Sequence, residues 1–286
     1  MLWIMIPAYN EENDLPLLLP KVHNALKSRN LAHRIVVVDD GSRDKTAVIL
    51  EQFKETLPLD VIQHPINRGL GETERDGFEF VARHADPNDR IVRVEADNTH
   101  EPDYIVNLLA KLDEGYDVVN TSRFQSGGGQ LGVDGYRALI SRAANLFMQF
   151  VFQVPGIRDY SCGYRAYRAS VIQDAIHVFG NNFIQLRGLG FTSTLEMVVK
   201  LRLLGCRFAE VPFVLRYDQK GGPSKMVSSI TTVGYLIMGL LYHWPFGGWL
   251  SQYRGLRKLY QTNPQEAVKK YGSSSLRRRT VSRISF

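Results

Sequence analysis

The sequence predicts an α/β fold in which a mostly parallel, Rossmann-like sheet is flanked by helices. Up to about residue 122, short apolar runs alternate with longer segments of helical period, as in βαβ units. The run from Arg34 to Val38 is apolar after its first residue, which is typical of a strand buried on both faces. Two acids, Asp39 and Asp40, follow it directly. Because ligands bind outside the carboxyl ends of strands in such sheets, these acids mark the expected binding edge.

The first half of the chain supplies five expected strands and four crossover helices. The strands are expected at Leu2–Ile6, Arg34–Val38, Leu59–Gln63, Ile91–Glu95 and Asp117–Asn120. The helices between them are expected at Glu12–Arg29, Asp44–Lys54, Gly71–His84 and Pro102–Glu114. Short apolar runs and longer periodic segments distinguish the two kinds of element.

The pattern changes after residue 122. A glycine-rich loop is expected over Phe124–Gly135, a helix over Tyr136–Gln153 and a polar, strand-like segment over Asp159–Ser170. A helix then ends at Gly205, a strand follows over Arg207–Tyr217, and a turn-rich loop follows over Asp218–Lys225.

The segment from Met226 to Tyr253 contains no charged residue other than histidine, but only Val233–Trp244 is densely apolar. This run is too short to cross a bilayer, which needs about 20 residues. Its apolar residues have helical spacing, so we expect amphipathic helices on a membrane surface, with Trp244 and Trp249 at headgroup level. A core helix or a dimer contact is the alternative. We therefore expect a domain over residues 1–226, interfacial helices over 227–253, and a basic, partly disordered tail over 254–286.

Charge is distributed unevenly. The chain of 286 residues has a net charge of +6, but residues 251–286 hold nine basic residues and one acid, which leaves the body slightly acidic. We therefore expect no nucleic-acid partner for the body, and an anionic membrane surface as partner for the tail. Two cysteines without metal-ligand spacing, and an N-terminus without a signal-peptide pattern, indicate a cytoplasmic protein associated peripherally with the cytoplasmic face of a membrane.

Four polar motifs fall at expected strand ends. They are IPAYNEEN, VVVDDGS, VEADNTHEP and SRF, which begin at Ile6, Val36, Val94 and Ser122. Carboxylates such as Asp39 and Asp40 can accept hydrogen bonds from a nucleoside base or ribose, although acids there can also cap a helix. Glu95 and Asp97 flank one small residue, and such a pair can bind Mg²⁺ or Mn²⁺ together with substrate phosphates.

Together with SRAANL, DYSCGYRAYR and GGPSKM, this ordered series resembles the family 2 glycosyltransferases of the GT-A fold. The later motifs are most similar to those of polyprenol-phosphate (dolichol-phosphate) mannose synthases. The resemblance covers roughly residues 2 to 245. It implies a nucleotide-sugar site formed by Pro7, Tyr9, Glu11, Asp39, Asp40, Glu95, Ala96, Asp97 and Lys225. It also implies an acceptor-phosphate site at Arg123, Arg137 and Ser141, metal ligands at Asp97 and Glu95, and catalytic roles for Asp97 and Arg123. We add Asp159 as a further candidate catalytic residue.

The chain departs from the family pattern at two positions. Glu95 replaces the usual first aspartate, so we expect Asp97 to be the main metal ligand and Glu95 to act through water or the ribose. Gln219 stands where the family has an arginine, and Lys220 or Arg216 are possible substitutes. Guanidinium and ammonium groups bind phosphates differently, so this difference bears on the identity of the donor.

The expected reaction moves a hexose, mannose or glucose, from GDP-mannose or a UDP-sugar to a polyprenyl phosphate. A phosphate monoester has a second pKa of about 6, so it needs no strong base, and we expect in-line attack with inversion. An alcohol acceptor would need a carboxylate base, with Asp159 or Glu196 as candidates. The alternatives are a soluble enzyme of the same family acting on a saccharide or secondary metabolite, and a non-catalytic sugar-nucleotide-binding protein. A homo-oligomer is a further possibility.

Overall fold

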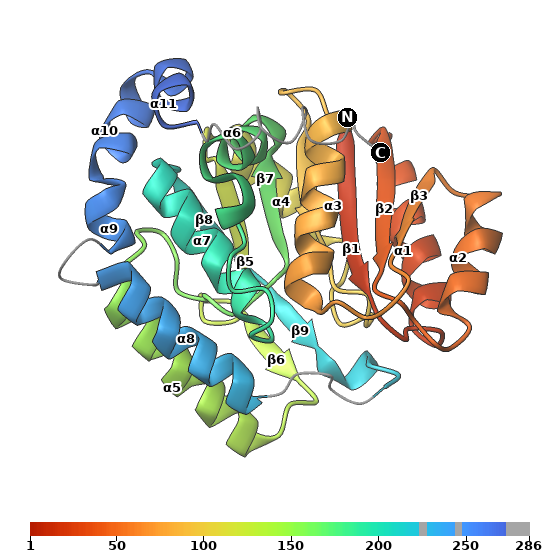
Figure 1. The fold of residues 1–286 in the computed structure, drawn as a ribbon. Coiled ribbons are helices and arrows are strands. Elements are labelled where there is room, and N and C mark those ends of the chain that lie inside the picture. Colours follow the sequence, from red (N-terminus) through yellow and green to blue (C-terminus); the bar gives the residue numbers. More distant parts are fainter. Residues whose placement is uncertain (223–227, 244–247, 273–286) are drawn as a thin grey trace.

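The core of the protein is a mixed sheet of seven strands in the order β3-β2-β1-β4-β7-β5-β8 (Figure 1). The computed structural model describes residues 1–222, 228–243 and 248–272. The strands of this sheet are Leu2–Ala8 (β1), His33–Asp39 (β2), Leu59–Gln63 (β3), Arg90–Arg93 (β4), Val118–Ser122 (β5), Arg165–Arg168 (β7) and Phe208–Pro212 (β8).

The strand pairing confirms the mostly parallel sheet expected from the sequence. β7 pairs antiparallel with β4 and β5, whereas every other pair in this sheet is parallel. The strand order reverses between β1 and β4, and the carboxyl ends of β1, β2 and β4 therefore lie together at one edge. Open sheets of this kind bind ligands at such a reversal.

A second, two-stranded sheet was not expected. Gly129–Leu131 (β6), inside the glycine-rich segment, pairs in parallel with Val214–Arg216 (β9). The strand expected over residues 207–217 is therefore divided, and Phe213 lies between β8 and β9. The backbone N–H of Gly129 donates to the Phe213 carbonyl, which joins the two sheets.

Helices cover both faces of the main sheet, and each face has its own apolar core. Leu15–Lys27 (α1), Thr46–Lys54 (α2) and Tyr104–Asp113 (α4) pack on one face. Leu70–His84 (α3), Ala169–Phe179 (α6) and Thr192–Leu204 (α7) pack on the other. Alternate residues of a strand belong to opposite cores, as the two-residue period of a strand requires. In β1, for example, Ile4 faces the first core and Met5 the second.

The remaining helices lie along the flank opposite α1 and α2 (Figure 1). They are Gly135–Phe152 (α5), Ser228–His243 (α8), Trp249–Gln252 (α9), Arg254–Thr262 (α10) and Pro264–Tyr271 (α11). Elsewhere in the fold, two short 3₁₀ turns span Gly180–Asn182 and Tyr217–Gln219. α5 and α8 lie side by side, with the rings of Phe152 and Tyr242 5.4 Å apart. Among the described helices, none is both long enough and apolar enough to cross a membrane.

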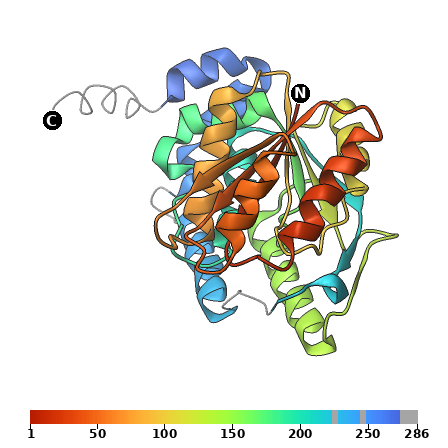
Figure 2. The same cartoon turned by 90° about the vertical axis from the view of Figure 1, so that its right-hand side faces the viewer.

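The first part of the basic tail is helical and packs on the body. α10 contacts α7 and α11 contacts α6, and Figure 2 shows blue helical ribbon of this segment along the top of the body. Leu256, Tyr260 and Ala267 are buried. The rest of the expected tail, residues 273–286, lies outside the described residues. Trp249 corrects a sequence-based expectation: it is buried, with the Lys200 ammonium 3.6 Å from its ring, and so does not lie at headgroup level. Trp244 lies outside the described residues.

Candidate active site

The turn after β2 buries Asp39 and Asp40 at the edge of the sheet. The turn depends on Gly41, which has a φ of +68°, and a Cβ there would lie 2.4 Å from the carbonyl carbon of Ile66. Asp39 accepts a hydrogen bond from the backbone N–H of Ser42 at 3.1 Å. The helix that follows, α2, begins without a side-chain cap. Neither acid therefore caps it, so the helix-cap interpretation of this motif is wrong; Asp44 Oδ1 accepts from the backbone N–H of Thr46, the first residue of α2, at 2.9 Å.

Asp40 also fixes the loop that follows β3. Its carboxylate accepts hydrogen bonds from the backbone N–H groups of Arg68 and Gly69, each at 2.9 Å, and His64 Nδ1 lies 2.7 Å away. Both oxygens of Asp40 are thus engaged within the protein, whereas Asp39 has the Ser42 contact and a longer one of 3.5 Å to Gln63. Asp39 retains more capacity to accept a hydrogen bond from a ligand.

The end of β1 is tied to the same turn. Pro7 is the penultimate residue of β1, Tyr9 is half-buried and Glu11 is buried. The backbone N–H of Glu11 donates to Thr46 Oγ1 at 2.8 Å, and Asn10 accepts from the N–H of Arg43 at 2.8 Å. The first two polar motifs therefore form one rigid surface, as their positions at neighbouring strand ends predicted.

Glu95 binds a buried cation, Arg93. Arg93 is almost fully buried, and its guanidinium lies between Glu95 and the equally buried Glu74, with Nη2 2.9 Å from Glu74 Oε1. The two carboxylates hold the pKa of Arg93 above its ordinary value in spite of burial. Gly163 leaves room for this group, because a Cβ there would overlap the Arg93 Nη1 and lie 2.8 Å from Glu95 Oε1.

His100 holds the turn that carries Glu95. Its Nδ1 accepts a hydrogen bond from the backbone N–H of Glu95 at 3.2 Å, and its ring stacks on Tyr164 with centroids 4.8 Å apart. Burial lowers the pKa of His100 to about 4, so the ring is neutral near pH 7 and can accept this bond. Neither Arg93 nor His100 was expected in the site from the sequence. Alternation along the strand could have indicated that Arg93 and Glu95 share a face.

Asp97 forms an ion pair with Lys220, from the loop after β9. Its other oxygen accepts from Thr99 Oγ1 at 2.6 Å. Burial alone would raise the pKa of Asp97, but Lys220 and the hydrogen bonds hold it below its ordinary value. The pKa of Lys220 is raised despite burial, by Asp97 and, more weakly, by Glu11. Lys220, which the sequence analysis named only as a possible substitute for an arginine, thus lies among the acids of the site.

The loop after β9 is attached to the β1 edge at a second point. The backbone N–H of Gly221 donates to Asp14 Oδ1 at 3.0 Å. Arg216 pairs with Asp218 on the surface and does not reach Asp97 in the described structure. Lys225, which was expected in the nucleotide-sugar site, lies outside the described residues.

The acids present fit part of a divalent metal site. Among the described residues, no three His, Cys, Asp or Glu side chains are grouped as metal ligands. Magnesium at nucleotide sites commonly takes only one or two carboxylates and completes its shell with water and phosphate. Asp97 fits this need by its carboxylate and its place at the sheet edge, although the Lys220 ammonium is bonded to one of its oxygens in the described structure. Glu95 fits less well, since one of its oxygens is bonded to Arg93.

Arg123 and Asp159 form a buried ion pair at the end of β5. Arg123 Nε and Nη2 donate to the two oxygens of Asp159 at 2.7 and 2.9 Å, and Nη2 also donates to Ser161 Oγ at 2.7 Å. Burial would raise the pKa of Asp159, but Arg123 holds it below its ordinary value. Both residues were expected to be catalytic, and the fold places them in direct contact across 36 positions of sequence.

The segment around Asp159 is held by two residues that the sequence analysis did not single out. Glu210 Oε1, in β8, accepts from the backbone N–H groups of Arg158 and Asp159, each at 2.7 Å. Asn145, in α5, accepts from the N–H of Tyr160 at 2.8 Å. Asn145 belongs to the SRAANL motif. The sequence therefore marked this segment, but the contact of Asn145 with Tyr160 is visible only in the structure.

Two of the three expected acceptor-phosphate residues, Arg137 and Ser141, lie in α5. Ser141 is half-buried in this helix, and the side chain of Arg137 lies outside what the structure describes. Tyr235 of the neighbouring helix α8 is near Arg123. Burial raises the pKa of Tyr235 to about 12, against the opposing charges of Arg165 and Arg123.

Known proteins with similar sequences and structures were found. The chain is 30% identical over 228 residues to a polyprenol monophosphomannose synthase of Mycolicibacterium smegmatis, covering 79% of this chain and 81% of that protein. It is 29% identical over 219 residues to a dolichol-phosphate mannosyltransferase of Pyrococcus furiosus, covering 76% of this chain but 57% of that protein.

Among solved structures, glucosyl-3-phosphoglycerate synthase from Mycobacterium tuberculosis, in complex with Mg²⁺ and uridine diphosphate, superposes with a TM-score of 0.55. The match covers 84% of this chain and 78% of that one at 16% identity, and it shows that the fold is that of the GT-A glycosyltransferases. Residues 3–175 match the sequence model of glycosyl transferase family 2. The chain therefore belongs to glycosyl transferase family 2, as the motifs at the strand ends predicted.

Proposed function

We propose that the chain transfers a hexose, mannose or glucose, from a nucleotide sugar to a polyprenyl phosphate at a membrane surface, with inversion at the anomeric carbon and with a divalent metal. The two relatives, both named for polyprenol- or dolichol-phosphate mannosyl transfer, support this acceptor class. The protein would act as a peripheral enzyme at the cytoplasmic face. The two buried, free cysteines are consistent with a reducing compartment.

The Arg123–Asp159 pair supports a phosphate acceptor more than a hydroxyl acceptor. A hydroxyl acceptor needs a general base with a pKa near the working pH. Asp159 is a poor base, because Arg123 lowers its pKa. A phosphate monoester is already a nucleophile near pH 7 and needs charge complementarity instead. Arg123 Nη1 has no partner among the hydrogen bonds of the described residues, and it can donate to such a phosphate.

The flank next to Arg123 supports action at a bilayer. α5 and α8 expose large apolar side chains, and Phe150 is 78% exposed. These residues are Tyr136, Leu139, Ile140, Leu146, Phe147 and Phe150 in α5, and Ile230, Val233, Leu236 and Leu240 in α8. Their helical spacing gathers the α5 residues on one face. Soluble surfaces seldom expose so continuous an apolar face, and a bilayer interface would cover it. A lipid-linked acceptor would then reach Arg123 from that bilayer.

The carboxyl ends of β1, β2 and β4 would hold the nucleotide sugar. Asp39 would accept hydrogen bonds from the nucleoside, while Asp40 keeps the adjoining loop in place. Asp97, with Glu95 contributing through water, would hold Mg²⁺ or Mn²⁺, which would neutralise charge on the pyrophosphate. Lys220 would have to leave Asp97 and could then contact the donor phosphates. The residues thus bind and orient both substrates, and catalysis depends on position and charge.

A non-catalytic role is the second candidate, because a cation binds each of the two acids Glu95 and Asp97. The test incubates the purified protein with a polyprenyl phosphate, a panel of nucleotide sugars and Mg²⁺ or Mn²⁺, and detects products by mass spectrometry. We expect a glycosyl phosphate polyprenol from one donor. Transfer to a saccharide hydroxyl instead would support the soluble alternative, and nucleotide binding without turnover would support the non-catalytic one.

A further inference from the structure

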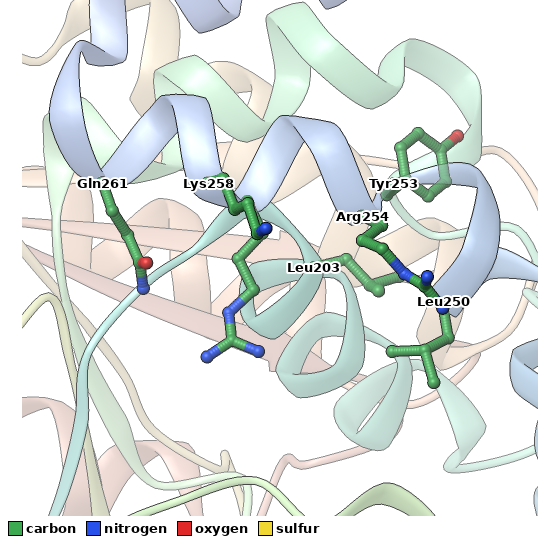
Figure 3. Close-up of a pocket in the computed structure, with 7 residues that line it drawn as sticks. Leu203, Leu250, Tyr253, Arg254, Lys258 and Gln261 are labelled. Atoms are coloured by element: carbon green, nitrogen blue, oxygen red, sulfur yellow. The ribbon is translucent and has the colours of Figure 1, made fainter.

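A groove of about 430 Å³ lies between α7, α9 and α10, apart from the candidate active site. Figure 3 shows Arg254 and Leu250 at one end of the groove, Gln261 at the other, and Leu203 in its wall. Its lining comprises Leu203, Leu250, Tyr253, Arg254, Arg257, Lys258 and Gln261. The groove thus combines three cations with apolar side chains.

The cations of the groove lack anionic partners. In residues 1–222, 228–243 and 248–272, no ion pair involves Arg254, Arg257 or Lys258. A fourth cation, Arg202, precedes the lining residue Leu203 in α7, and its pKa is lowered by burial and by the charge of Arg257. Like charges repel when they are brought together. An anion in the groove would relieve this repulsion, and guanidinium groups bind phosphate with paired hydrogen bonds.

The apolar part of the lining indicates that the anion is amphipathic. Leu250, which is 39% exposed, and Tyr253 lie beside the cations. A small inorganic anion would make no use of their exposed apolar surface. The groove also continues the apolar flank, because α9 contacts both α8 and α10 (Figure 1).

We propose that this groove binds the phosphate headgroup of an anionic phospholipid, with the lipid's glycerol and first acyl carbons against Leu203, Leu250 and Tyr253. The assignment rests on the proposed action at a membrane surface. It gives the protein a second lipid site, which recognises the bilayer itself and is separate from the acceptor site at Arg123. Binding of the headgroup would set the orientation of the protein on the membrane, so that α8 faces the bilayer.

The first experiment measures binding of a short-chain phosphatidylglycerol, kept below its micelle concentration, by NMR or calorimetry. We compare the native protein with R254Q/K258Q and with the control K269Q/K270Q. All four side chains are exposed, and each variant removes two charges, but Lys269 and Lys270 lie on α11 outside the groove. We expect saturable binding that weakens about fivefold for each neutralised groove residue, and a change below twofold in the control. Equal weakening in both variants, or no saturable binding, would overturn the proposal.

Inorganic phosphate serves as the second probe in the same measurement. We expect it to bind at least tenfold more weakly than the phospholipid, because it cannot use the apolar lining. Equal affinity for the two probes would show that the groove is a plain phosphate site and would contradict the lipid assignment. A Leu203→Asn variant should weaken the phospholipid and leave phosphate unchanged, and unfolding curves check that it folds.

A parallel assay separates this inference from the proposed function. Glycosyl transfer to a short, detergent-soluble polyprenyl phosphate needs the acceptor site but not the groove, so R254Q/K258Q should retain it in detergent. If the native protein transfers no sugar but binds phosphatidylglycerol through the groove, the proposed function fails and the inference stands. If transfer proceeds and vesicles with and without phosphatidylglycerol bind equally, the inference fails alone.

Discussion

Two regions of the molecule use charged and apolar side chains in opposite ways. At the carboxyl edge of the main sheet, charged groups are buried and neutralise one another, as in the Arg93–Glu95 and Arg123–Asp159 pairs. Along the flank formed by α5, α8 and α10, apolar side chains are exposed and cations have no anionic partner in the described structure. Most charged groups of the edge are thus paired within the chain, whereas the exposed apolar side chains and the cations of the flank have no such partners among the described residues.

This difference predicts how substitutions act in each region. A buried pair that loses one member leaves an uncompensated charge, so changes at the edge should reduce folding stability and chemistry together. Exposed groups make few contacts that folding depends on, so changes along the flank should alter membrane binding and leave stability unchanged.

Asp159→Asn should have the largest effect on stability. The variant keeps the shape of the side chain but leaves the Arg123 guanidinium buried without its counter-charge, which should cost about 3–5 kcal/mol of unfolding free energy. Urea unfolding measures the change. Asp113→Asn is the matched control, because its partner Arg90 is on the surface, and it should cost less than about 1 kcal/mol. Similar losses of unfolding free energy in both variants would show that burial of the Arg123–Asp159 pair does not increase its contribution to stability.

Asp97→Asn should lower kcat by about 10²–10³-fold, the usual effect of removing one group that stabilises developing charge. Glu95→Gln is the comparison within the same motif. Because Glu95 is bonded to Arg93, we expect a smaller loss of rate, below about tenfold, and a clearer loss of stability. The two variants are compared by steady-state rates, measured with the donor and acceptor that the mass-spectrometry test identifies, and by unfolding curves. Equal rate losses would instead make Glu95 a full metal ligand.

The sheet edge could be predicted largely because its signals are local. A short apolar run followed by acids places Asp39, Asp40 and Asp97 at strand ends, and parallel strands bring those ends together. The Arg93 site could not be predicted as a whole. It needs Glu74 from α3 and the space left by Gly163, and Gly163 reaches Arg93 because β7, the strand that follows it, is inserted beside β4.

The flank was harder to interpret from sequence. The exposed residues of α5 have the same spacing as a helix that faces a core, so Leu146 and Phe150 carried no sign of exposure. α10 has apolar residues with helical spacing at Leu256, Leu259 and Tyr260. Basic residues lie between them, so the segment was interpreted as part of a basic tail. Trp249 was assigned to the membrane interface by composition, although Lys200 and the body bury it.

The pH dependence of stability tests the edge through His100. Its pKa is about 4 in the folded protein and 6.5 ordinarily, so between these values the unfolded chain binds a proton that the folded chain does not. Stability should therefore fall as pH decreases from 6.5 to 4, by up to about 3 kcal/mol from this group. His100→Asn should remove that part of the slope. Parallel curves for the two proteins, measured by urea unfolding, would contradict the assignment.

Substitutions in the apolar flank should weaken membrane binding and leave the unfolding free energy unchanged. Replacing Leu146 and Phe150 with glutamine removes two exposed side chains that would enter the bilayer, and should weaken vesicle binding about thirtyfold, or about 2 kcal/mol. The control L17Q/V48Q removes two apolar side chains, each 59% exposed, from α1 and α2 on the opposite side. Co-sedimentation should leave the control unchanged. Equal weakening would mean that the α5 face does not define the membrane contact.

The Lys220–Asp97 ion pair should be the exception among the ion pairs of the edge. Its loop lies where the donor must enter, so we expect this pair to open and the others to stay closed. In the described structure its ammonium occupies Asp97, the expected metal ligand. Lys220→Ala should therefore tighten Mn²⁺ binding, measured by calorimetry without donor, by about fivefold, since the ammonium no longer competes. Lys111→Ala removes a surface ion pair with Glu114 and should leave Mn²⁺ affinity unchanged. If Lys220→Ala instead weakens Mn²⁺ binding, the ammonium and the metal do not share Asp97. The pair would then be a fixed part of the edge, equivalent to Arg93–Glu95, and not a contact that opens for the donor.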